Sequence, residues 1–126
     1  MFNEKPLRVS IPVGDMARAK QFYAEKLGLY LLIEHEFATV FGSPDCQIAL
    51  VPSEDVARAT YSLVTWVVDD IRAQMAALRQ TGIEFEEYDF GNLKTVDGVA
   101  QFDDDFVAWF KDSEGNLLAL TELHGI

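Results

Sequence analysis

The pattern of apolar and polar residues switches twice from alternation to helical spacing. Residues 7–13, LRVSIPV, alternate apolar with polar or small residues, and residues 14–28 then carry apolar side chains at helical intervals. The second switch occurs within residues 63–82, where a β-rich run leads into Ile71, Met75 and Leu78 at spacings of 4 and 3. The pattern therefore predicts two units in which a strand leads into a helix.

Both predicted helices carry signals for their ends. Asp15 and Asp70 precede the helical stretches and are suited to accept hydrogen bonds from the free backbone N–H groups of the first turn. Gly28 and Gly82 follow the helical stretches and tolerate the left-handed conformation that ends many helices. An offset of 55 residues aligns the two Asp residues and the stretches around them, which indicates an internal repeat.

Three short strand candidates follow each helix. They are residues 29–36, 37–43 and 46–52 in the first half, and residues 83–90, 105–112 and 116–123 in the second. The order β-α-β-β-β is therefore expected twice. The stretch 91–105 is polar and contains glycine, and we predict it to be the least regular part of the chain.

The length of 126 residues suits one domain with a real core. We expect a single domain over residues 1–126, with module 1 at about 7–52, a linker at about 53–60 and module 2 at about 61–123.

Charge and cysteine content narrow the expected partners and compartment. The net charge of −11 disfavours nucleic acid and anionic membrane surfaces as partners. No apolar run approaches the roughly 20 residues that a membrane span needs, and the first ten residues show no signal-peptide core. The single cysteine, Cys46, fits a reducing compartment and is interpreted as a bystander rather than a nucleophile. These features predict a cytoplasmic protein.

Three segments together resemble the vicinal oxygen chelate superfamily, which includes glyoxalase-like enzymes, dioxygenases and bleomycin-resistance proteins. They are IPVGDMARAKQFYAEKLGL at 11–29, VVDDIRAQMAALRQTGI at 67–83 and FKDSEGNLLALTEL at 110–123. The resemblance covers nearly the whole chain, in the order and spacing of the family. It implies an α+β fold of two βαβββ modules, whose curved mixed sheets form a cleft and whose helices lie outside.

The resemblance also identifies the positions at which metal-dependent members hold a divalent ion. Those members use four strand residues, typically His, Gln or Glu, two from each module. The corresponding positions in this chain are Arg8, Ala49, Leu63 and Ala119. Arginine has no lone pair to offer a metal, and alanine and leucine have no donor atom. We therefore expect no metal ligand and no cofactor at these positions.

A displaced metal site is the alternative. It would use His35, His124 and Glu122 together with the acidic run Asp103 to Asp105. We favour a solvated loop for the acidic run, and Glu122 has the opposite strand parity from Ala119.

Strand parity and the resemblance together predict the side chains that face the cleft. The predicted ligand-binding residues are Arg8, Ser10, Gln47, Ala49, Leu63, Thr65, Leu117, Ala119 and Thr121. This surface is mostly apolar with a few separated polar groups, as is usual for a small-molecule pocket. It contains no pair of a nucleophile and a base, so we assign no catalytic residue. Arg8 would either hold an anionic group of the ligand or pair with an acidic residue of the chain.

The leading hypothesis is a metal-free protein that binds a small organic molecule and sequesters a drug or metabolite. The alternative is a lyase or dioxygenase that depends on a divalent metal held by displaced ligands. A third hypothesis is a cleft filled by the chain's own side chains, with a role in protein interaction. We also expect a homodimer, because the segments FATVF and FVAWF carry apolar residues on both parities.

Overall fold

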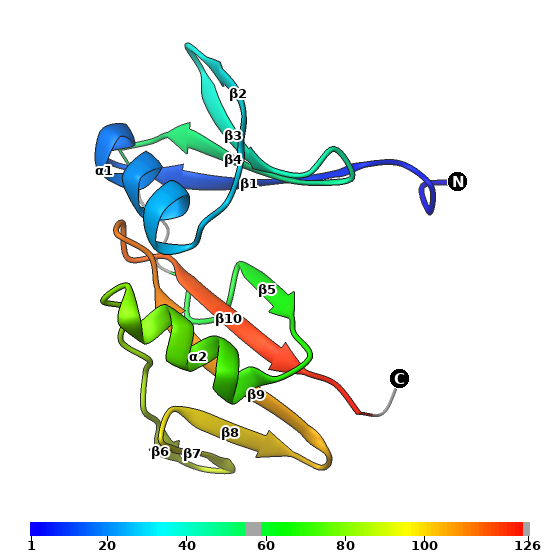
Figure 1. Cartoon of the computed structure of the whole chain (residues 1–126), viewed down its shortest axis with the longest axis vertical. Helices are drawn as coiled ribbons and strands as arrows, with labels where there is room; N and C mark the ends of the chain where they lie inside the picture. Colours follow the sequence, from blue (N-terminus) through cyan, green and yellow to red (C-terminus); the bar gives the residue numbers. More distant parts are fainter. Residues whose placement is uncertain (55–58, 125–126) are drawn as a thin grey trace. The chain divides into compact units, whose positions relative to one another are not determined.

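The computed structural model describes residues 1–54 and 59–124 (Figure 1). The chain forms two compact units, one of residues 1–58 with 113–115 and the other of residues 59–112 with 116–126. The predicted linker at 53–60 includes residues 55–58, which lie outside the described residues.

The first unit is a four-stranded sheet with one helical segment. Its elements are β1 (Leu7–Val13), α1 (Met16–Gln21), the π-helical turn η1 (Phe22–Lys26), β2 (Leu31–His35), β3 (Ala38–Gly42) and β4 (Cys46–Pro52). The strand order is β1-β4-β3-β2, with β1 parallel to β4 and the other neighbours antiparallel. The expected order β-α-β-β-β is therefore confirmed for this unit.

The first helical segment begins and ends at the residues that the sequence indicates. The Asp15 carboxylate accepts a hydrogen bond of 3.0 Å from the backbone N–H of Arg18. The helix then changes from α to π geometry, in which the N–H of Leu27 donates to the carbonyl of Phe22 over 3.2 Å. Gly28 follows with φ +68°, a conformation that glycine adopts at little cost. The two ends were predictable, whereas the π-helical turn was not.

The second unit is a six-stranded sheet with one α-helix. Its elements are β5 (Val64–Val67), α2 (Ile71–Gln80), β6 (Asp89–Phe90), β7 (Leu93–Val96), β8 (Val99–Phe102), β9 (Asp105–Lys111) and β10 (Leu117–Glu122). The strand order is β5-β10-β9-β8-β7-β6, with β5 parallel to β10. Helix α2 runs beside β9 and β10 and contacts both (Figure 1).

Helix α2 is capped at both ends. Asp70 accepts from the N–H of Ala73 over 3.1 Å, as predicted. At the other end Gly82 has φ +96° and its N–H donates to the carbonyl of Arg79. The N–H of Ile83 reaches back to the carbonyl of Leu78. These two bonds form a Schellman motif, which satisfies carbonyl groups that the helix leaves free.

The prediction that residues 91–105 are irregular is wrong. Strands β7 and β8 form a hairpin there, because Asp97 and Gly98 both have positive φ, 52° and 82°, and make the two-residue turn typical of tight hairpins. The predicted strand at 83–90 is reduced to a bridge between Phe85 and Phe110 and to the two residues of β6. The Asp-Gly pair was the signal for this hairpin.

The core of the second unit lies between α2 and one face of the sheet. Ile71, Met75 and Leu78 are buried on the helix. On the sheet, the Trp66 ring stacks on the fully buried Phe110 at 6.4 Å between ring centroids. Trp66 therefore lies on the same face of the sheet as Phe110.

A substitution at Gly98 tests the packing of the hairpin between β7 and β8 against α2. A methyl group added there would meet Met75 Cε at 3.0 Å and Phe85 Cβ at 3.1 Å, in addition to the cost of positive φ. We expect Gly98→Ala to lower the free energy of unfolding by about 2–4 kcal/mol, from backbone strain and overpacking together. The control is Gly91→Ala, since Gly91 has φ +58° but no atom within 4 Å of the added methyl, and it should cost only about 1 kcal/mol. Urea unfolding measures both variants, and equal losses would contradict the packing of the hairpin against α2.

Candidate functional site

The predicted site residues of the first unit share one face of its sheet. In the parallel pairing of β1 with β4, Arg8 lies opposite Gln47 and Ser10 lies opposite Ala49. Paired residues project to the same side of a sheet, and residues two apart do so as well. The opposite side carries Phe41, whose ring contacts Tyr23 of the helical segment at 6.2 Å between centroids. The four predicted residues therefore lie on the face away from the helix.

The centre of this face is a small apolar cluster. Ala49 lies opposite Val40 in β3, and the two pack with Ala38 and with the partly buried Val51. Ala49 is 2% exposed and Val40 is fully buried. Ser10, beside Ala49, is exposed. A ligand on this face would therefore contact the exposed polar side chains around the cluster rather than Ala49 itself.

Arg8 is held in place by a side-chain amide. Its Nε donates to Gln47 Oε1 over 2.9 Å, and Gln47 Nε2 donates to the backbone carbonyl of Pro44 over 3.2 Å. Within the part of the chain that the structure describes, no carboxylate lies within 4.0 Å of the Arg8 guanidinium. Arg8 was expected either to bind an anionic group of a ligand or to pair with an acidic residue of the chain. Among the described residues, the second of these is not observed.

The predicted site residues of the second unit also share a face. Ala119 in β10 lies between Thr65 in β5 and Trp109 in β9. Leu117 and Thr121, two residues away on either side, are buried like Ala119, which is 1% exposed. Thr65 is exposed and Trp109 is half-buried, with its ring edge-to-face against Tyr88. Leu63 precedes β5, and its N–H donates to the carbonyl of Leu117 over 2.9 Å.

The residues at the family's metal positions do not fit a metal ion. Arg8, Ala49, Leu63 and Ala119 supply no lone pair that a divalent cation would accept. Among residues 1–54 and 59–124, no group of three or more His, Cys, Asp or Glu side chains is arranged to hold an ion.

The side chains that were considered as metal ligands of a displaced metal site make other contacts. Glu122 accepts from the N–H of Ile71 over 2.8 Å and pairs with His124, and these contacts, the first being the larger, lower the pKa of Glu122. His35 Nδ1 accepts from the N–H of Phe37, and Asp105 accepts from the N–H of His124. Glu122 therefore serves the first turn of α2.

Glu114 is an important residue that sequence analysis missed. Its carboxylate accepts from the N–H groups of Gly14 and Asp15 over 3.0 and 2.8 Å and from the Arg18 guanidinium over 2.8 Å. The Glu114 side chain is fully buried, and Arg18 together with these N–H groups lowers the pKa of Glu114 to about 2. Glu114 thus completes the turn between β1 and α1, which orients the start of the helical segment.

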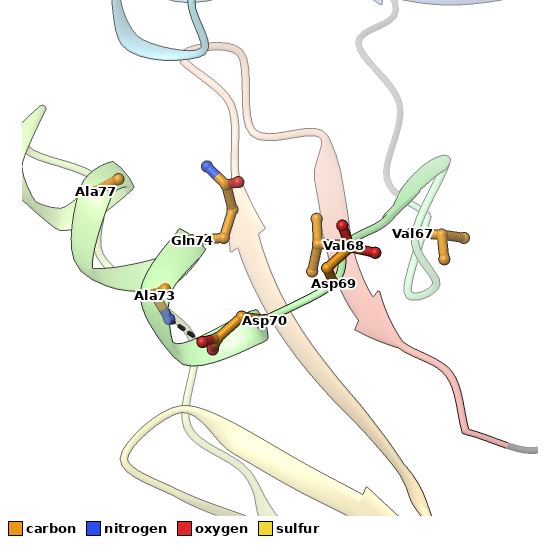
Figure 2. Close-up of a pocket in the computed structure, with 7 residues that line it drawn as sticks. All are labelled: Val67, Val68, Asp69, Asp70, Ala73, Gln74 and Ala77. Carbon is orange, nitrogen blue, oxygen red and sulfur yellow. Dashed lines mark hydrogen bonds between the residues drawn. The ribbon is translucent and has the colours of Figure 1, made fainter.

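A surface groove lies at the start of α2 in the second unit (Figure 2). It is open and has a volume of about 490 Å³. The lining residues are Val67, Val68, Asp69, Asp70, Ala73, Gln74 and Ala77. None of them is a predicted ligand-binding residue, and the Asp70 carboxylate is engaged in capping the helix.

The two sheet-and-helix units make this an α+β protein. The profile of the Glyoxalase/Bleomycin resistance protein/Dioxygenase superfamily matches residues 5–120. The chain therefore belongs to this superfamily, as its motifs predict.

Solved structures of similar fold cover nearly the whole chain. A glyoxalase family protein from Enterococcus faecalis is 25% identical, with a TM-score of 0.74 over 97% of this chain and 100% of its own. TnmS3, an antibiotic binding protein from Streptomyces sp. CB03234, is 21% identical, with a TM-score of 0.71 over 98% and 99%. UcmS2 is 22% identical, with a TM-score of 0.75 over 94% and 98%. No curated protein sequence matches the chain.

Sequence analysis missed one neighbour of the site and one contact between two of its residues. Val40 shares the face of Ala49, and the alternation in FATVF was the available signal. The contact between Arg8 and Gln47 depends on the register of two strands far apart in the sequence, for which no local pattern exists.

No helix among the described residues has the length and apolar character to span a membrane.

Proposed function

We propose that this protein binds a small organic molecule without a metal ion and sequesters a drug or metabolite. The observation that carries the proposal is the set of residues at the family's four metal positions, which are Arg8, Ala49, Leu63 and Ala119. A chain that keeps the fold but has apolar residues and a fixed cation at these positions has lost the means to chelate. A chain with this fold can still bind a small molecule on its strand faces without a metal ion.

The chemistry of the two strand faces supports binding. Each face combines an exposed polar side chain, Ser10 on one and Thr65 on the other, with a partly exposed apolar side chain, Val51 on one and Trp109 on the other, and small-molecule sites usually combine apolar surface with a few polar groups. Trp109 shares the face of Ala119 and offers part of an aromatic surface. The similarity to TnmS3, an antibiotic binding protein, is also consistent with this role. The proposal assigns no catalytic residue.

The protein is further proposed to be a cytoplasmic homodimer. Strand β2 and its flanks expose apolar side chains, namely Tyr30, Leu31, Leu32, Ile33 and Phe37. Exposed apolar surface of this kind is typical of an interface, and contact burial at about 25 cal/mol per Å² outweighs a charge repulsion screened beyond about 8 Å. Light scattering at micromolar concentration should give the mass of two chains, and the mass of one chain would refute the dimer.

A thermal-shift screen tests the binding proposal. Bleomycin and a panel of aromatic acids, amides and amines are the probes. A ligand at about 100 times its dissociation constant should add roughly 2.7 kcal/mol of stability and raise the melting temperature by several degrees. A panel without any stabilising compound would favour a role in protein interaction instead.

Metal analysis of the same protein tests the alternative of a metalloenzyme with displaced ligands. We expect less than stoichiometric divalent metal in protein purified without chelator. A stoichiometric ion, lost together with activity in His35→Ala or His124→Ala, would establish the metalloenzyme and overturn the proposal.

A further inference from the structure

We propose that the face around Ser10 and Ala49 selects small organic anions, and that Arg8, oriented by Gln47, is the group that binds the anionic end. This inference rests on the proposed function and names the chemical class of its ligand. The class is an apolar or aromatic body that carries a carboxylate.

The hydrogen bonds of Arg8 support this assignment. The guanidinium has five N–H donors, and Nε uses one of them in the bond of 2.9 Å to Gln47 Oε1. The amide of Gln47 is itself fixed through Nε2 to the carbonyl of Pro44. Four N–H groups on the two terminal nitrogens therefore remain, on a guanidinium whose orientation is restrained. This geometry suits a carboxylate, which accepts two parallel N–H bonds.

The position of Arg8 relative to the apolar cluster supports the expectation that the ligand carries an apolar or aromatic body. Arg8 and Ser10 are two residues apart on one strand face, which corresponds to about 7 Å. Ser10 adjoins Ala49, which adjoins Val40. A carboxylate bound at Arg8 would thus have its ring or chain over Ser10 and the edge of the apolar cluster.

The Arg8 guanidinium belongs to an acidic protein but has no salt bridge among the described residues, as is also the case for Arg72 and Arg79. The chain has 21 acidic and 10 basic residues, yet among the described residues no carboxylate lies within 4.0 Å of Arg8. Asp45 is close in the fold, since its carbonyl accepts from the N–H of Leu7, but its carboxylate lies outside that distance. Distant charges are screened over about 8 Å at physiological salt, so the local cation should dominate a direct contact.

Three matched probes test the inference: 2-naphthoate, 2-naphthamide and 2-naphthylmethylammonium. They share one ring system and differ in charge. We expect the wild-type protein to bind the carboxylate about tenfold more tightly than the amide, and the ammonium most weakly, in isothermal titration. Arg8→Gln should remove the preference by weakening binding of the carboxylate about tenfold while the affinity for the amide stays unchanged.

Gln47 provides a test of positioning. Gln47→Glu is nearly isosteric and places a carboxylate against Arg8. The negative charge of this carboxylate neutralises the charge of the Arg8 guanidinium. This variant should lose the preference for 2-naphthoate as Arg8→Gln does, and should keep its affinity for 2-naphthamide. Lys94→Gln is the control for net charge, because Lys94 is exposed on β7 of the second unit, and it should retain the tenfold preference.

The outcomes separate this inference from the proposed function. If the amide binds as tightly as the carboxylate, or the ammonium binds most tightly, the face binds small molecules but does not select anions, and the inference is overturned. If Arg8→Gln keeps the preference, Arg8 is not the anion-binding group. If none of the three probes binds up to millimolar concentration while another compound of the thermal-shift panel does, the inference is overturned and the proposed function stands; if no compound of the panel binds either, the proposed function fails.

Discussion

Ser10→Trp is expected to weaken binding of 2-naphthoate by at least thirtyfold. Ser10 is exposed, and it lies beside Ala49 on the face that we propose to be the binding surface. An indole there would occupy the space next to the apolar cluster that a ligand ring would use. Tryptophan is favoured in strands and the position is exposed, so the fold should persist. Thirtyfold corresponds to about 2 kcal/mol, within the range expected from losing one buried aromatic contact.

Val96→Trp is the matched control for Ser10→Trp. Val96 is 63% exposed and also lies on a strand, β7, but belongs to the second unit and to none of the predicted site positions. It should bind 2-naphthoate as the wild-type protein does. Unchanged binding in folded Ser10→Trp, checked by circular dichroism, would show that the ligand binds elsewhere.

Glu114→Gln is expected to lower the free energy of unfolding by about 2 kcal/mol at pH 7. The pKa of Glu114 is about 2 in the folded chain against an ordinary value of 4.5, and this difference corresponds to at most about 3 kcal/mol. Arg18, its main partner, is 57% exposed, so solvent screening reduces that figure. Glutamine keeps the shape of the side chain but loses the charge that Arg18 and the two N–H groups stabilise.

The pH dependence of this loss follows from the direction of the shift. A carboxylate whose folded pKa is lowered stabilises the fold fully above its unfolded pKa, and the contribution disappears as the pH falls towards the folded pKa. The difference between wild type and Glu114→Gln should therefore be constant from pH 7 to about pH 5, and should shrink below about pH 4.5 towards zero near pH 2. Urea unfolding at a series of pH values measures it.

The control for Glu114 is Glu25→Gln. Glu25 is exposed on η1 and bonds only to Gln21 among the described side chains. This variant should stay within about 0.5 kcal/mol of wild type throughout the pH series. A difference between Glu114→Gln and wild type that does not change with pH would contradict the charge-based account of Glu114.

Local signals in the sequence were sufficient for the parts of the fold that depend on neighbouring residues. Asp15 and Asp70 cap the helices because their carboxylates reach N–H groups three residues on, and the two glycines follow from backbone sterics. The hairpin at Asp97 was also readable, but the polar composition of 91–105 concealed it. The strand at 83–90 is mostly absent because β8 pairs with residues 105–107 of β9, and only residues 85–86 contact the remaining end of β9, at Trp109 and Phe110.

The candidate site depends more on contacts between distant residues. Strand parity together with the family resemblance was enough to predict that Ser10 and Ala49 share a face, since this requires only the alternation of side chains and the order of strands. Burial of Ala49 and Ala119 was not predictable, because it depends on how neighbouring side chains pack. The contacts of Arg8 with Gln47 and of Glu114 with Arg18 join residues 39 and 96 positions apart, and the chain carries no local signal for either.

The central claim is that this superfamily member binds its ligand without a metal ion. The most direct measurement is the dissociation constant of 2-naphthoate on one protein sample before and after treatment with EDTA, and again after addition of zinc or manganese. We expect the same constant within twofold in all states, because Arg8, Ala49, Leu63 and Ala119 offer no metal ligand. Binding that disappears with EDTA and returns with the metal would contradict the account.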